Sequence, residues 1–137
     1  AETLFAAVAE AAVRCKLRDF NPQAMTNTVW AFATAGVRAE ALFAAMAQAA
    51  VDSRLHNFNP QELTNTVWAF ATAGVRAEVL FAAVAEAALG SELRSFKPQD
   101  LANAVWAFAT AGVRAEALFT AVAESAVGSG LRDFKPQ

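Results

Sequence analysis

Two side chains in this sequence have the chemistry of a nucleophile or a proton carrier, the thiol of Cys15 and the imidazole of His56. Neither has suitable companions, because no Ser-His-Asp set, Gly-rich phosphate loop or cluster of metal ligands accompanies them. A single cysteine also excludes an internal disulfide and a paired-cysteine metal motif. We therefore expect no catalytic site, no metal site and no cofactor.

The same sequence unit recurs along the chain, and its other copies replace both residues. Arg18, Arg94 and Arg132 align with His56, and Ser53, Ser91 and Ser129 align with Cys15. Exchange of this kind indicates variation at a polar loop position and not an active site.

Three ladders of residues recur every 38 positions and are better suited to binding. The arginine ladder is Arg38, Arg76 and Arg114, the asparagine ladder is Asn27, Asn65 and Asn103, and the tryptophan ladder is Trp30, Trp68 and Trp106. The guanidinium groups could bind successive phosphates, or each could bond carbonyls at a helix C-terminus and complement the helix dipole. Each amide could read a base edge or satisfy a loop backbone. Each indole could stack on a base, but we favour an indole packed between repeats.

A fourth candidate is a stripe of the expected first helices that differs between copies, where Arg14, Gln48 and Glu86 lie. Recognition of a mixed RNA sequence requires differences between otherwise equal repeats, so a code would be written there. The glutamates of this stripe would repel phosphate, and a protein partner suits the face at least as well.

The period of 38 residues predicts the fold. Residues 1–38 and 39–76 differ at ten positions, and the chain of 137 residues divides into repeats 1–38, 39–76, 77–114 and a partial copy 115–137. Two-helix repeats of this length stack into a superhelix. We therefore predict an all-α fold, an α-solenoid of antiparallel helix pairs forming one domain over 1–137.

Within the unit 39–76, the apolar spacing of Phe43, Met46 and Ala50 predicts a first helix over about 39–52. Asn59 before Pro60 is typical of a helix start, which predicts a second helix over about 60–73. Glycine at position 74 supplies the left-handed stop. The connection between the helices contains Leu55 and Phe58, which we expect to fill the gap between them.

The second helix has two opposed stripes that are identical in every complete copy, Leu63, Val67 and Phe70 on one side and Gln61, Asn65, Trp68 and Thr72 on the other. Two such stripes predict a helix packed between neighbours. The positions that vary, Ala24/Glu62/Asp100 and Thr28/Thr66/Ala104, are expected to face solvent. On the first helix the variable positions also share one side.

Composition narrows the function further. The net charge is -2 and the isoelectric point about 5.4, without a basic or acidic tail. No apolar stretch reaches the roughly 20 residues that span a bilayer. The chain lacks an initiating Met and a targeting segment, and it stops within a repeat, so we expect it to be a fragment of a larger chain or assembly.

The run from Phe58 to Ala71, with Pro-Gln at the helix start and Asn-x-x-Trp-Ala one turn later, recurs from Phe20 and Phe96 and starts again at Phe134. It resembles the second-helix signature of the octotricopeptide repeat family. That resemblance implies a helical-repeat protein of an organelle, chloroplast or mitochondrion, that binds single-stranded RNA. The alternative is a protein–protein scaffold or structural subunit of a large organelle complex, such as a photosynthetic supercomplex or ribosome.

The arginine ladder yields a test of RNA binding. Three phosphate contacts to single-stranded RNA should give a slope of log affinity against log salt of about -2, since each contact contributes roughly -0.7. Replacing all three arginines with Gln should flatten this slope in a salt series measured by fluorescence anisotropy. A slope that ignores the triple substitution removes the ladder from the interface.

Overall fold

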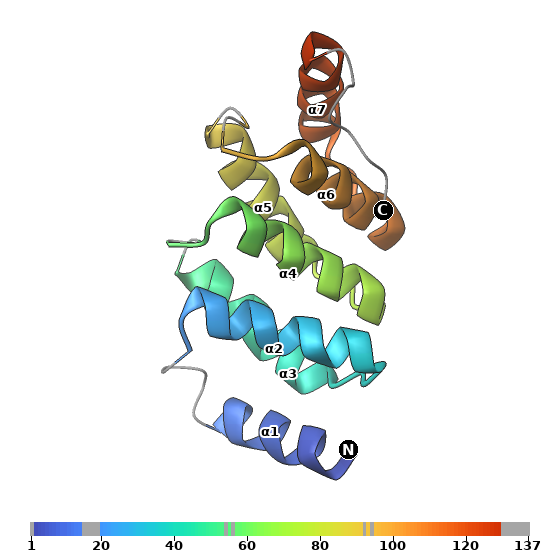
Figure 1. The fold of residues 1–137 in the computed structure, drawn as a ribbon. Coiled ribbons are helices and arrows are strands. Elements are labelled where there is room, and N and C mark those ends of the chain that lie inside the picture. The colour runs from blue at the N-terminus through green and yellow to red at the C-terminus, as the bar shows by residue number, and fades with distance from the viewer. Residues whose placement is uncertain are drawn as a thin grey trace.

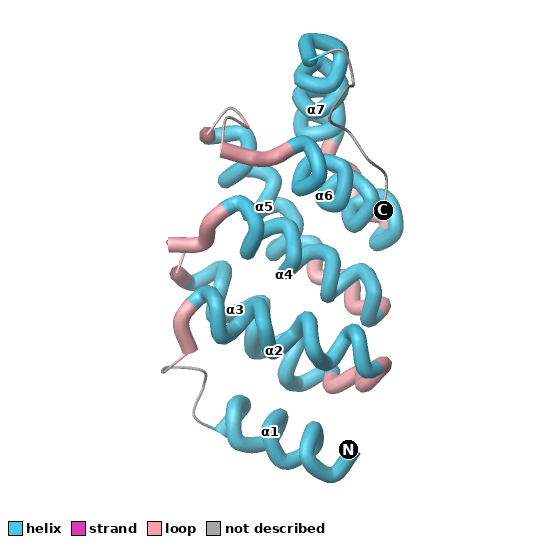
Figure 2. The backbone as a smooth tube through the Cα atoms, in the orientation of Figure 1, coloured by secondary structure: helices cyan, strands magenta, loops and turns pink. Residues whose placement is uncertain are grey.

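The computed structural model describes residues 2–14, 20–53, 55, 57–91, 93 and 95–129, and all regular structure in these ranges is helical. Cys15, His56 and the fourth copy of the signature at Phe134 lie outside the described residues. Figures 1 and 2 show the helices stacked one above another, joined by short loops. The helices are α1 (Glu2–Arg14), α2 (Pro22–Ala35), α3 (Glu40–Asp52), α4 (Pro60–Ala73), α5 (Glu78–Gly90), α6 (Pro98–Ala111) and α7 (Glu116–Ser129).

The second helices begin and end where the sequence predicts. At the start of α4, the Asn59 side chain accepts a hydrogen bond from the Glu62 N–H at 2.7 Å, and the Glu62 carboxylate accepts one from the Asn59 N–H at 3.0 Å. This reciprocal pair satisfies two N–H groups that the helix itself leaves unpaired. At its end Gly74 has φ of 75°, a left-handed conformation that glycine adopts without steric cost.

The helices form two layers. The second helix of each pair, α2, α4 or α6, packs chiefly on the second helices of neighbouring pairs, while α1, α3, α5 and α7 follow one another in the other layer. The all-α fold of stacked antiparallel helix pairs is therefore confirmed. Each pair contacts its neighbours along the stack, which is the arrangement expected of a helical-repeat protein.

Phenylalanines join the two layers within each pair. Phe43 and Phe70 meet edge to face with ring centroids 4.9 Å apart, and Phe81 and Phe108 do so at 5.0 Å. All four rings are at most 1% exposed. Edge-to-face contacts contribute about 0.5–1.5 kcal/mol each beyond the apolar area that they bury.

The connection between the two helices of a pair turns around a buried leucine. Leu55 is 6% exposed and Leu93 is 7% exposed, at φ values of 57° and 61°. A left-handed conformation costs a non-glycine residue roughly 1–2 kcal/mol, and burying a leucine side chain returns about 1.5–3 kcal/mol. The prediction that Leu55 fills the gap is confirmed, and Phe58 packs beside the core half buried.

Alanine lies where the second helices touch. Ala69 and Ala107 are fully buried in the contacts between α2, α4 and α6. The equivalent Ala31 is exposed, because it lies on α2, the first second helix in the row. A methyl group at this position lets the helix axes approach closely. The same repeat position therefore has two environments, which the chain's own symmetry makes directly comparable.

The prediction that the variable positions of the second helices face solvent is wrong. Thr66 and Ala104 are 6% and 5% exposed, and the Thr66 hydroxyl lies 3.1 Å from that of Thr26 on the adjacent helix. On a helix wheel these variable positions fall on the same side as Ala69, so they face the neighbouring second helix. The stripe that contains Asn65 and Trp68 faces solvent instead.

The two environments of the alanine position give a matched pair of variants. Ala69→Leu should lower the free energy of unfolding by about 1–3 kcal/mol, because the larger side chain has no space between α2 and α4. Ala31→Leu should change it by no more than about 0.5 kcal/mol. Equal effects in urea denaturation would contradict close packing of the second helices.

Candidate nucleic-acid interface

One face of the second helices presents the same four residue types in every pair. We call this face the outer stripe: Gln23, Asn27, Trp30 and Thr34 on α2; Gln61, Asn65, Trp68 and Thr72 on α4; Gln99, Asn103, Trp106 and Thr110 on α6. Its glutamines and threonines are exposed in all three helices. The outer stripe carries no charged side chain, so it is a polar and aromatic surface.

The indoles of the outer stripe are surface residues. Trp30 and Trp106 are 45% and 44% exposed, and Trp68 is half buried. Trp30 and Trp68 stack between neighbouring pairs, with ring centroids 6.2 Å apart and planes at 29°. The favoured prediction, that each indole packs between adjacent repeats, fits Trp30 and Trp68, of which Trp68 also packs against the core; Trp30 and Trp106 are exposed and are not core residues. Aromatic faces open to solvent on successive repeats are suited to stacking on bases.

The asparagines of the outer stripe have no protein partner among the described residues. Asn27 is exposed, Asn65 is half buried, and neither side chain makes a hydrogen bond in this part of the chain. The Asn103 Oδ1 atom is buried and unpaired, which costs about 1–3 kcal/mol. The bond to a loop backbone that would explain a retained asparagine is therefore absent from the described structure.

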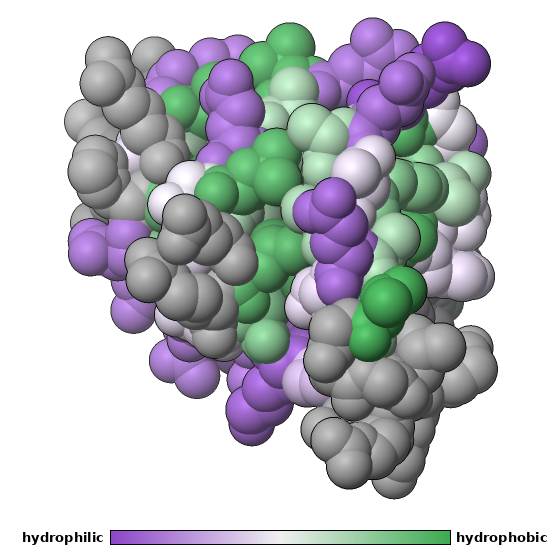
Figure 3. All heavy atoms as spheres, turned by 90° about the horizontal axis from the view of Figure 1, so that it is seen from above, coloured by the Kyte–Doolittle hydropathy of each residue, from purple (hydrophilic) through white to green (hydrophobic). Residues whose placement is uncertain are grey.

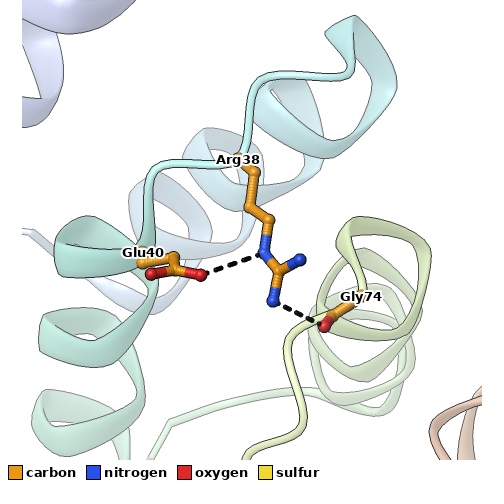
Figure 4. Close-up of polar contacts among 3 residues, drawn as sticks. All are labelled: Arg38, Glu40 and Gly74. Carbon is orange, nitrogen blue, oxygen red and sulfur yellow. Dashed lines mark hydrogen bonds and ion pairs between the residues drawn. The ribbon is translucent and has the colours of Figure 1, made fainter.

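Two arginines of the ladder, Arg38 and Arg76, reach into the next repeat. The Arg38 Nη2 donates to the Gly74 carbonyl at 3.2 Å while its Nε lies 3.3 Å from the Glu40 carboxylate, as Figure 4 shows. Arg76 repeats both contacts, at 2.9 Å to the Gly112 carbonyl and 3.0 Å to Glu78. The alternative that the guanidinium bonds helix-terminal carbonyls is thus what the structure shows, with the carbonyl on the following helix pair.

The paired glutamates weaken the arginine ladder as a phosphate site. Each carboxylate offsets the charge of the adjacent guanidinium, and both side chains of the Arg38–Glu40 pair are more than half exposed. Arg114 makes no bond to another described residue. Phosphate contact by these three arginines remains a prediction.

The variable residues of the first helices lie on the other layer. Arg14, Gln48 and Glu86 are exposed, as are the variable Val79 and Glu124. The structure does not bring them to the outer stripe. The prediction that variable first-helix positions share one exposed side is confirmed.

Variation between repeats is thus distributed differently on the two layers. On the first helices it falls mainly on exposed positions, which is the usual result of drift at a surface. On the second helices it falls on buried or half-buried positions such as Thr66, while the outer stripe, which is mainly exposed, is identical in all three copies. Stability alone gives no reason to keep an exposed stripe unchanged, so the outer stripe is the candidate interface.

The sequence contained the signal for this site. Its four residue types are identical in every complete copy, and its asparagines and tryptophans are binding candidates by residue type. The same identity also predicts a helix packed between neighbours, which the exposed glutamines and threonines contradict.

The described ranges give no support for a metal site or a membrane-spanning helix. They contain no group of three or more His, Cys, Asp and Glu residues arranged to hold a metal ion. No helix among them is both long and apolar enough to cross a membrane. Figure 3, which views the stack from above, shows hydrophobic and hydrophilic residues interspersed on that end.

Comparison with known families gives a match to a family model. The family model described as RNA-editing substrate-binding complex 6 protein matches residues 2–137, almost the whole chain. It is a helical-repeat family and differs from the octotricopeptide repeat family that the signature resembles. No curated protein is similar enough to count as a relative.

The arginine contacts supply a matched pair of variants. Arg76→Gln removes the ion pair to Glu78 and the bond to the Gly112 carbonyl, and should lower the free energy of unfolding by about 0.5–1 kcal/mol, since solvent screens exposed contacts. Arg114→Gln removes neither kind of contact and should leave stability unchanged. Thermal melts in which the two variants are equally destabilised would show that Arg76 does not hold adjacent repeats together.

Proposed function

We propose that this chain, which belongs to the family of RNA-editing substrate-binding complex 6 proteins, binds single-stranded RNA along the outer stripe of α2, α4 and α6. The single observation that carries this proposal is an identical Gln, Asn, Trp and Thr set on the second helix of three successive repeats, with its glutamines and threonines and two of its tryptophans exposed. Indole faces would stack on bases, and the side-chain amides would bond base edges.

Stacking suits the low charge of this protein. Binding through a basic groove needs several lysines and arginines, whereas the outer stripe has none and the net charge is -2. Each base stacked on an aromatic side chain contributes roughly 1–3 kcal/mol, and this contact needs no positive charge on the protein. Phosphate contact by Arg38, Arg76 and Arg114 would add to this affinity and is a secondary proposal.

The family also supports an RNA-related role in an organelle. The family is named after a subunit of a complex that binds RNA-editing substrates and acts in kinetoplastid mitochondria. We propose a mitochondrial location and a non-catalytic role for residues 1–137, acting as one helical-repeat domain. A chloroplast location and the octotricopeptide family itself gain no support from the comparison.

A second candidate function, attachment to a protein partner, is favoured by the first-helix layer. That layer exposes Glu86 and Glu124 beside Val79, which is 69% exposed. Carboxylates repel phosphate, while a mixed acidic and apolar surface suits a protein. We propose that this layer holds the chain in its complex while the outer stripe binds RNA.

Removing the exposed indoles tests the RNA-binding face. The double substitution Trp30→Ala with Trp106→Ala should weaken binding of single-stranded RNA by at least about tenfold, because two stacking platforms are lost. Fluorescence anisotropy with a labelled RNA oligonucleotide at low salt measures this change.

The control for this variant is Val79→Ala, which removes an exposed apolar side chain from the other layer and should leave RNA affinity unchanged. Circular dichroism should show that both proteins remain helical. RNA binding that is lost with Val79→Ala and retained without the two indoles would place the interface on the first helices.

A further inference from the structure

The outer stripe repeats without any change, and this uniformity bears on which RNA it selects. We propose that the outer stripe selects a uniform tract, meaning single-stranded RNA in which the same base recurs, over RNA of mixed sequence. This inference rests on the proposed RNA-binding function and names the class of RNA that the same site takes.

The first reason is that identical side chains at the reading positions of successive repeats cannot specify different bases. Repeat proteins that read a mixed sequence place different side chains at the reading positions of successive repeats. On the outer stripe none of the four positions differs between α2, α4 and α6. The three helices also share their backbone frame, since each starts at a proline and ends at a glycine with φ between 71° and 75°.

The second reason is that the stripe contains a base reader as well as a stacking platform. An indole accepts any base, because every base has an aromatic face. A side-chain amide has one acceptor oxygen and two donor hydrogens, so it distinguishes bases by the donors and acceptors on their edges. The side chains of Asn27 and Asn65 make no hydrogen bond to another described residue, and identical amides at equivalent positions would select the same base.

The third reason is the free-energy cost of the asparagine at position 103. The Asn103 Oδ1 atom is buried without a hydrogen bond, whereas an apolar residue at this position would avoid an unpaired acceptor. Folding gives no reason for an amide there, yet all three helices retain it. Hydrogen bonds among the described residues therefore do not explain why the amide is retained.

The variable residues of the first helices do not supply a code that could override this uniformity. Gln48 and Glu86 lie on the other layer, and the Gln48 amide already donates to the Asp52 carboxylate at 2.8 Å. The carboxylates of Asp52 and Glu86 on this layer disfavour an approaching phosphate backbone.

The test compares RNA affinities of the whole chain by fluorescence anisotropy at low salt. The ligands are four oligonucleotides of equal length made only of adenosine, cytidine, uridine or 7-deazaguanosine, the last chosen because it avoids four-stranded structures, and one unstructured oligonucleotide of mixed sequence. One uniform oligonucleotide should bind at least about tenfold more tightly than the mixed one, because each base reader adds discrimination. Equal affinity for all five, or tightest binding of the mixed sequence, would overturn the inference.

Two variants locate the source of the preference. Replacing Asn27, Asn65 and Asn103 with Ala should bring the affinities of the uniform and mixed oligonucleotides to within about twofold while stacking still retains RNA. The control Gln48→Ala with Glu86→Ala should keep the preference, and circular dichroism should show both proteins folded. Loss of the preference in the control alone would assign base reading to the first helices and refute the inference.

The outcomes for the two proposals are distinguishable. RNA bound without preference between uniform and mixed sequences overturns the inference and leaves the proposed function standing. Absence of binding to all five oligonucleotides at low salt contradicts the proposed function as well.

Discussion

Close contact between the second helices sets the geometry of the whole molecule. Ala69 and Ala107 are fully buried where these helices meet, and their small methyl groups allow the helices to approach closely. This spacing brings Trp30 within stacking distance of Trp68 and brings the arginine of one repeat to the glycine carbonyl of the next. The outer stripe is a continuous surface because adjacent helices lie this close together.

The remaining contacts hold each pair in a constant orientation. Edge-to-face phenylalanines such as Phe43 and Phe70 join the layers within a pair, and the buried Leu55 fixes the turn between its helices. No pair could bury its own apolar faces alone, since each helix covers residues of its neighbours. Order along the stack is therefore cooperative, and the presentation of the outer stripe depends on contacts that lie behind it.

Much of this fold could be predicted from the sequence, because helix ends and repeat periods are local properties. Pro60 and Gly74 mark the bounds of α4, and the 38-residue period predicts stacked pairs. The direction of each helix face could not be predicted, because a wheel gives relative angles and not the neighbours. Thr66 looked like a surface residue, yet its hydroxyl bonds the Glu62 carbonyl at 2.7 Å and the side chain is buried against α2. The arginine contacts join residues 36 positions apart, which the sequence alone cannot pair.

The arginine contact to the following repeat has an evolutionary consequence. The first two pairs each donate a guanidinium to a glycine carbonyl of the following pair, so these two joints share the same contact. A duplicated gene segment of 38 codons would encode a pair that fits both of its new neighbours without further mutation. The length of such a protein can therefore grow or shrink by whole units while every joint stays chemically matched.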